Sequence, residues 1–96
     1  MTSKQRSYLK GLAMNLDPIF QIGKDMLTPE ITEAVKETFN THELIKINVL
    51  KNCLDDPKSM AAILAERTGS ELVQVIGKKI VLYKENKDNK KIELPK

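Results

Sequence analysis

Three prolines divide the chain into segments that cannot form one continuous helix. Pro18, Pro29 and Pro57 each mark a boundary between different kinds of local structure. Proline disfavours helical conformation in the residue before it, so a helix that precedes Pro18 must end there. Pro29 and Pro57 instead follow Thr28 and Asp56, and a hydroxyl or carboxylate followed by proline is typical of a first helical turn. The chain must therefore alternate between helices and other elements.

The spacing of apolar residues predicts three helices between these breaks. The first covers about residues 3–15 and is capped by Thr2 or Ser3. The second begins at Thr28, and the third ends at Gly69, because glycine favours the conformation that closes a helix. The residues expected on the buried stripes are Gln5, Leu9, Leu12, Ala13 and Leu16, then Ile31, Ala34, Val35, Thr38 and Phe39, then Met60, Ile63 and Leu64.

Four short strands are predicted in the remaining segments. Residues 18–22 are rich in β-branched and aromatic side chains, and residues 44–51 alternate, with apolar side chains at the odd positions from 45 to 49. Residues 72–76 and 79–83 flank Gly77-Lys78, a pair whose leading glycine suits a two-residue type II′ hairpin turn. The last two strands should therefore pair antiparallel.

The resulting order, α-β-α-β-α-β-β, predicts an α/β fold. Strands joined through a helix are normally parallel, so the hairpin makes the sheet mixed. A chain of 96 residues with 41% hydrophobic and 30% charged residues suits one globular domain. We predict a single domain over residues 1–96, with a four-stranded mixed sheet packed with helices. Residues 86–96 are expected to form a mobile tail, on which Ile92 and Leu94 dock only briefly.

Several functional classes are disfavoured by what the chain contains. No run of about 18 apolar residues and no leader with a cleavage site is present, so we expect a cytoplasmic protein without a membrane partner. One cysteine cannot form an intramolecular disulfide, and one cysteine with one histidine cannot supply the usual zinc sites. We therefore expect a reducing compartment, with no metal and no cofactor. We also expect a monomer.

Catalysis would require groups that this chain does not combine. A nucleophile with a base would have to be Cys53 or a serine together with His42, the one histidine. His42 is better explained by its place near the end of the second helix, where an imidazole suits the negative helix terminus. Asp55 and Asp56 have no third metal ligand nearby, and neither Gly-Lys pair continues into a phosphate-loop motif. We expect no enzyme and no small-molecule substrate.

Positive charge is concentrated toward the two ends of the chain. The net charge of +3 is distributed as +2 over residues 1–27, −3 over residues 28–56 and +4 over residues 57–96. If the fold brings the two ends together, one face becomes positive and the middle segment supplies a negative one. Such a division lets a weakly basic protein bind a polyanion.

Five short segments resemble one known family. They are Leu9-Lys10-Gly11-Leu12-Ala13, Ile22-Gly23-Lys24 running into Leu27-Thr28, His42-Glu43-Leu44-Ile45-Lys46, Val73-Gln74-Val75-Ile76-Gly77-Lys78 and Val81-Leu82-Tyr83. In this order they resemble the CRM domain (chloroplast RNA splicing and ribosome maturation) in its stand-alone bacterial YhbY form. The resemblance implies an α/β RNA-binding domain, similar to the C-terminal domain of translation initiation factor three, that associates with precursors of the large ribosomal subunit.

The loop after the first strand departs from the family pattern. The family has Gly-x-x-Gly, where glycines let the backbone approach nucleotide phosphates, but here Met26 takes the last place after Gly23. We expect its Cβ to block that approach or to force a non-positive φ, and Asp25 to repel phosphate. Met26→Gly should then raise RNA affinity without loss of the fold.

The candidate RNA contacts follow from charge and from this resemblance. They are Lys4, Arg6 and Lys10 on the first helix, Gly23, Lys24, Met26 and Thr28 at the loop and helix start, and Lys78, Lys79 and Lys84 around the hairpin. With two Tyr and two Phe, the chain lacks an aromatic platform for stacking bases, so we expect recognition of phosphate and shape. About four phosphate contacts would give a slope of roughly −3 to −4 in log affinity against log salt.

We therefore expect a non-enzymatic protein that binds ribosomal RNA in precursors of the large subunit and assists ribosome assembly. It would neutralise phosphates, stabilise one RNA conformation and then dissociate. The alternative is a protein-interaction adaptor in ribosome assembly, which would use the acidic second helix to bind a basic ribosomal protein or an assembly enzyme.

Overall fold

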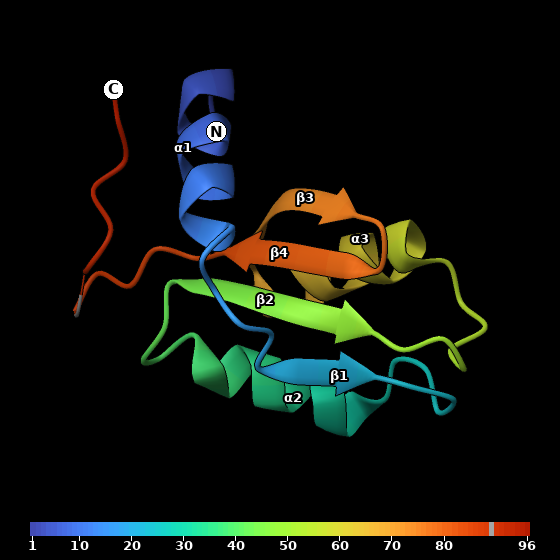
Figure 1. Cartoon of the computed structure of the whole chain (residues 1–96). Helices are drawn as coiled ribbons and strands as arrows, with labels where there is room; N and C mark the ends of the chain where they lie inside the picture. The colour runs from blue at the N-terminus through green and yellow to red at the C-terminus, as the bar shows by residue number, and fades with distance from the viewer. Residues whose placement is uncertain (89) are drawn as a thin grey trace.

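The computed structural model describes residues 1–88 and 90–96, and it has the predicted order of elements (Figure 1). The elements are α1 (Ser3–Ala13), β1 (Phe20–Ile22), α2 (Pro29–Thr38), β2 (Leu44–Val49), α3 (Pro57–Thr68), β3 (Glu71–Ile76) and β4 (Lys79–Tyr83). The predicted α/β fold with a four-stranded mixed sheet is confirmed. No helix in the described ranges is long and apolar enough to cross a membrane.

The sheet has the strand order β1-β2-β4-β3. β1 and β2 are parallel and connected through α2, whereas β4 pairs antiparallel with both β2 and β3. Ile76 pairs with Lys79 across the predicted two-residue turn, in which Gly77 has a φ of 57°. A register shift between Leu72 and Gln74 forms a bulge in β3.

Helices cover the two faces of the sheet unequally. α2 and α3 lie behind the sheet in the view of Figure 1, and together they bury one face. Their core contains Ile22, Val35, Phe39, Ile45, Ile47, Val49, Cys53, Met60, Ala61, Leu64, Ile80 and Leu82. α1 lies on the other face and covers one end of it, where Leu9 and Ala13 pack with Leu44, Val73, Val81 and Tyr83. No helix of the described ranges covers the remainder of that face.

Three predicted core positions are wrong because α1 and α3 bury narrower stripes than their sequences suggest. Leu12 and Leu16 are 37% and 36% exposed, since α1 ends at Ala13 and meets the sheet mainly through Leu9 and Ala13. Ile63 is 40% exposed on α3, whose buried side is formed by other residues. β1 begins at Phe20, whereas the strand was predicted to cover residues 18–22.

The helix boundaries follow the predicted capping chemistry, with one difference. Thr2 forms a capping box with Gln5 at the start of α1. Gly69 ends α3 in the left-handed conformation with a φ of 67°. Asp56 occupies the cap position of α3, but its carboxylate makes no cap hydrogen bond and instead accepts from the hydroxyl of Ser59 at 3.3 Å.

The segment after β4 is tied to the domain by Glu43. The side chain of Glu43 is 4% exposed, and its carboxylate accepts hydrogen bonds from the backbone N–H groups of Asn86, Lys91 and Ile92. Ile92 and Leu94 pack against the α1 side of the core. These contacts give the tail a defined path over the domain, and the mobility expected from its composition stays a prediction.

Candidate nucleic-acid interface

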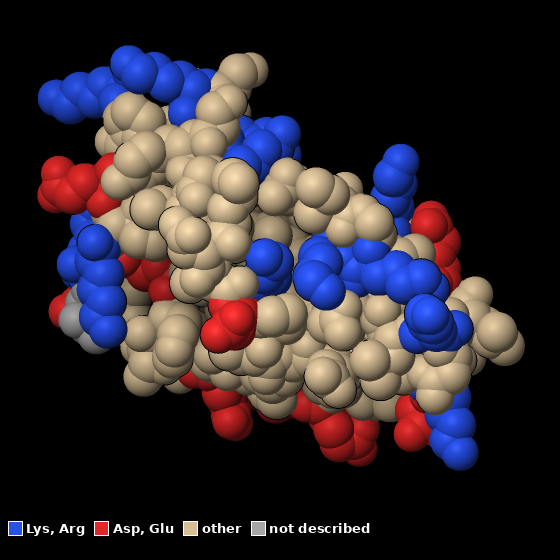
Figure 2. All heavy atoms as spheres, viewed as in Figure 1, with Lys and Arg blue, Asp and Glu red and all other residues tan. Residues whose placement is uncertain are grey.

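Lysine and arginine side chains gather on the side of the molecule that carries α1. Figure 2 shows a row of them across the sheet face, which continues toward the end where β1 and β2 finish. Acidic side chains lie along the margin of the molecule near α2, the helix to which Glu30, Glu33 and Glu37 belong, all three of them exposed. The charge separation expected from the sequence is therefore present in space, and it favours a polyanion on the α1 side.

Three loops meet at this end of the sheet, and each of them carries one of Lys24, Lys51 and Lys78, which we call the strand-end lysines. The loop after β1 touches the loop after β2, because a Cβ added to Gly23 would lie 3.3 Å from Oδ1 of Asn52. The hairpin joins them, since the N–H of Val49 donates to the carbonyl oxygen of Lys78 at 2.7 Å. All three lysines are exposed.

Met26 holds the conformation that a glycine would favour at its position. Its φ is 58°, and its N–H donates to the carbonyl oxygen of Gly23 at 3.0 Å, closing a four-residue turn. The expectation that the Cβ forces a non-positive φ is therefore wrong. A left-handed φ costs a residue with a Cβ about 1–2 kcal/mol, so the surrounding loop imposes this shape.

The start of α2 has fewer free donors than the sequence suggests. The hydroxyl of Thr28 accepts from the N–H of Ile31 at 3.2 Å, and its carbonyl oxygen accepts from the N–H of Thr32 at 3.1 Å. Pro29 has no N–H, so at most the N–H groups of Thr28 and Glu30 remain for a ligand at this helix start. Thr28 acts as the helix cap, and a phosphate at this position would depend mainly on Lys24.

Arg6 and Lys84, which were predicted to contact RNA, donate hydrogen bonds to backbone carbonyl oxygens inside the domain. Nη1 of Arg6 donates to the carbonyl oxygens of Leu72 and Val73 at 2.7 and 3.1 Å, which joins α1 to the bulge of β3. Nζ of Lys84 donates to the carbonyl oxygen of Thr68 at 3.1 Å, at the negative end of α3. Both side chains therefore have structural roles.

The row on the sheet face includes a lysine that sequence reasoning missed. Nζ of Lys46 donates to the carbonyl oxygens of Ala13 and Leu16 at 3.1 and 3.3 Å, where α1 ends. Nζ of Lys79, on the neighbouring strand, donates to Oδ1 of Asn48 at 2.9 Å. The alternation of residues 44–51 places Lys46 opposite the buried face, but nothing local in the sequence shows that α1 ends beside it.

The lysines of α1 extend the cationic side beyond the sheet. Lys4 and Lys10 are exposed, and neither makes a side-chain hydrogen bond or ion pair with another described residue. Their ammonium groups are therefore available to a ligand. Lys51 is a further candidate contact that the sequence did not predict, because the meeting of its loop with the loop of Gly23 is a tertiary contact.

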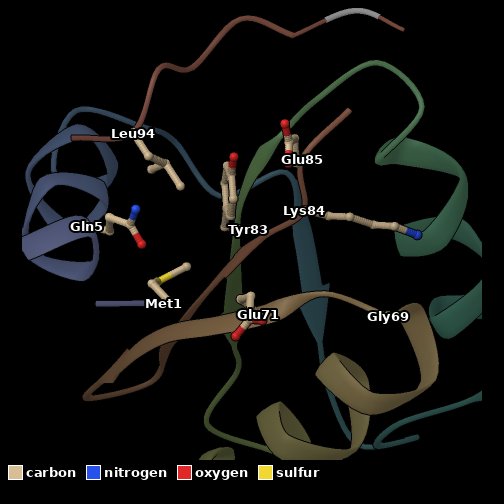
Figure 3. A pocket seen from close by; sticks show the side chains of 8 residues that line it. All are labelled: Met1, Gln5, Gly69, Glu71, Tyr83, Lys84, Glu85 and Leu94. Carbon is tan, nitrogen blue, oxygen red and sulfur yellow. The ribbon is translucent and has the colours of Figure 1, made fainter. Parts of the chain in front are cut away.

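A pocket of ≈ 410 Å³ lies at the opposite end of the sheet (Figure 3). Its lining comes from the chain start, α1, the turn after α3, β3, β4 and the tail, and consists of Met1, Gln5, Gly69, Glu71, Tyr83, Lys84, Glu85 and Leu94. Burial raises the pKa of Tyr83, and the carboxylates of Glu43 and Glu85 raise it further.

Within the described ranges, no cluster of three or more His, Cys, Asp or Glu side chains could hold a metal ion. The pocket at the opposite end of the sheet is lined by the carboxylates of Glu71 and Glu85, which make it a poor site for a phosphate.

The fold and the cationic side define an α/β domain suited to a polyanion, and comparisons with known proteins agree. The model of the CRS1 / YhbY (CRM) domain family matches residues 1–84. The chain therefore belongs to this family, as the sequence resemblance predicted.

Three of the similar proteins match over nearly their full length. The chain is 45% identical over 95 residues to "Probable RNA-binding protein YqeI" of Bacillus subtilis, covering 99% of each chain. It is 32% identical over 96 residues to "RNA-binding protein" of Haemophilus influenzae, covering 100% of this chain and 96% of that one. The solution structure of the hypothetical protein SAV1595 from Staphylococcus aureus has a TM-score of 0.84 and 53% identity, with 99% of each chain covered.

Proposed function

We propose that this chain is a non-enzymatic RNA-binding protein that binds ribosomal RNA in precursors of the large ribosomal subunit and assists its assembly, as a monomer in the cytoplasm. The observation that carries the proposal is the meeting of the three separate loops that carry Lys24, Lys51 and Lys78. All three lysines are exposed at the end of the sheet where β1 and β2 finish, and Figure 2 shows acidic side chains along the margin near α2. The names of the relatives support RNA as the polyanion.

The binding energy comes mainly from phosphate neutralisation. Each ammonium group that approaches a phosphate releases condensed counterions, so affinity falls steeply as salt concentration rises. The exposed lysines lie on loops and on α1, and they can adjust to the irregular backbone of a folded RNA. Since the net charge of the chain is only +3, affinity is moderate, which suits a factor that must dissociate when assembly proceeds.

Crosslinking in cells, followed by sequencing of the attached RNA, tests the proposal. The expected result is enrichment of large-subunit ribosomal RNA, together with sedimentation of the protein with precursor particles. The Lys24→Ala/Lys78→Ala variant should lose most of this signal. The Lys36→Ala/Arg67→Ala variant removes the same charge from α2 and α3 and should keep it. Crosslinks to other RNA classes alone would contradict the ribosomal part of the proposal.

The adaptor function remains the second candidate because of one observation on α2. Glu30, Glu33 and Glu37 are exposed and make no ion pair with another described residue. The Glu33→Lys/Glu37→Lys variant distinguishes the two candidates. If the chain binds RNA, this variant should sediment with precursor particles as the unchanged protein does. If the chain is an adaptor, the variant should be released from the particles.

A further inference from the structure

Part of the sheet face on the α1 side is left uncovered, and its side chains are polar. α1 packs over Leu44, Val81 and Tyr83, and its coverage ends near Lys46, whose ammonium group binds the carbonyl oxygens at the end of the helix. Beyond that point no helix among the described residues lies above the side chains of this face. An open sheet face is a surface on which a ligand can lie across several strands.

Four residues on this open face form one transverse row, which we call the amide row. Gln21 pairs with Asn48, Asn48 pairs with Lys79, and Lys79 pairs with Ile76, so the row crosses β1, β2, β4 and β3 in sequence. Neighbouring strands lie about 4.8 Å apart, and the row therefore extends roughly 14 Å. Gln21 is exposed and Ile76 is 59% exposed.

The two amides of the row offer a chemistry that the lysines lack. Nζ of Lys79 donates a hydrogen bond to Oδ1 of Asn48. The two N–H donors of this amide therefore stay available to a ligand. The exposed amide of Gln21 offers both donors and an acceptor. Phosphate oxygens only accept hydrogen bonds, whereas the edges of nucleotide bases both donate and accept. A pair of adjacent amides therefore matches base edges better than it matches a phosphate.

The position of the row selects unpaired RNA over duplex. In an A-form duplex the deep, narrow major groove cannot be read by side chains, and the shallow minor groove is recognised mostly by its shape and its 2′-hydroxyls, whereas unpaired bases can be splayed out and hydrogen-bonded on their edges. The exposed side chain of Ile76 supplies an apolar contact for a base at one end of the row. Lys79 lies between this contact and the amides.

We infer that the amide row is a base-contacting part of the RNA surface, which binds an unpaired segment across the four strands while the strand-end lysines bind its phosphates. This inference rests on the proposed function and adds to it, because it assigns base contacts to a surface on which the sequence led us to expect only phosphate and shape recognition.

The test measures binding of the full chain to short labelled RNAs of equal length at one salt concentration. Four unpaired RNAs of different sequence and one duplex are compared by fluorescence anisotropy. The Gln21→Thr/Asn48→Thr variant removes both amides with a residue that suits strands, and Asn40→Thr removes an exposed amide from the loop after α2 as the matched control. Thermal unfolding of each variant verifies the fold.

The unchanged protein and Asn40→Thr should favour unpaired RNA and distinguish the best from the worst sequence by on the order of 10-fold. The double variant should lose most of that difference while keeping its salt dependence. Equal binding of all sequences and the duplex, or discrimination that persists in the double variant, would overturn the inference but leave the proposed function standing. Absence of RNA binding by the unchanged protein at low salt would instead overturn the proposed function.

Discussion

The guanidinium of Arg6 donates a hydrogen bond to the carbonyl oxygen of Leu72 across 2.7 Å. The same nitrogen reaches the carbonyl oxygen of Val73, so one side chain satisfies two carbonyls at the bulge of β3. Lys10, one turn further along α1, is exposed and has no such partner among the described residues. Two cations that look equivalent in the sequence therefore have different physical roles.

The different roles of these cations predict different effects on stability. Arg6→Ala should lower the free energy of unfolding by about 1–3 kcal/mol, because charged hydrogen bonds to partly buried carbonyls are lost. Lys10→Ala should change it by less than about 0.5 kcal/mol. Urea denaturation of both variants measures the difference. Equal effects would show that the bond to Leu72 does not hold α1 on the sheet.

The left-handed conformation of Met26 predicts that glycine is favourable there. Met26→Gly should raise the free energy of unfolding by about 0.5–1 kcal/mol, because the relieved backbone strain exceeds the entropy that a glycine adds to the unfolded chain. Ala62→Gly in the middle of α3 is the control and should cost about 1 kcal/mol. Loss of stability in both variants would mean that the contacts of the methionine side chain outweigh its strain. RNA affinity of Met26→Gly should rise, as predicted from the sequence.

The carboxylate of Glu43 predicts a pH-dependent attachment of the tail. Burial alone would raise the pKa of Glu43, but the N–H groups of Asn86, Lys91 and Ile92, together with the charge of Lys90, hold it below its ordinary value of 4.5. The ionised carboxylate is thus favoured in the folded state, and its contribution is complete above about pH 4.5 and lost as the pH falls through the lowered pKa.

Glu43→Gln should lower the free energy of unfolding by roughly 1–2 kcal/mol at pH 7, and the difference from the unchanged protein should shrink at pH 3. Hydrogen exchange at the Ile92 amide reports the tail directly and should become faster in the variant at pH 7. A stability difference that is the same at both pH values would contradict the role assigned to the charge.

The fold could be predicted from the sequence because its boundaries depend on local chemistry. Thr28 followed by proline, and Gly77 at the start of a two-residue turn, fix the start of α2 and the hairpin without help from distant residues. Leu12 could not be placed correctly, because its exposure depends on how much of the sheet α1 covers.

The candidate site was less predictable than the fold, because it depends on tertiary contacts between distant segments. Lys24 and Lys78 could be proposed from charge and from the resemblance, but Lys51 joins them only because Gly23 contacts the loop of Asn52. The structural role of Arg6 depends on a bulge 66 residues away along the chain. Contacts of this range leave no periodic pattern in the sequence.

The central claim is that the cations on the α1 side bind the sugar-phosphate chain, and the salt dependence of RNA affinity tests it most directly. The slope of log affinity against log salt is measured for the unchanged protein, for Lys24→Ala/Lys78→Ala and for the charge-matched Lys36→Ala/Arg67→Ala. The first pair should flatten the slope by about 1.4–1.8, and the second should leave it nearly unchanged. Equal flattening by both pairs would contradict the claim, because RNA affinity would then follow net charge and not the surface that these lysines form.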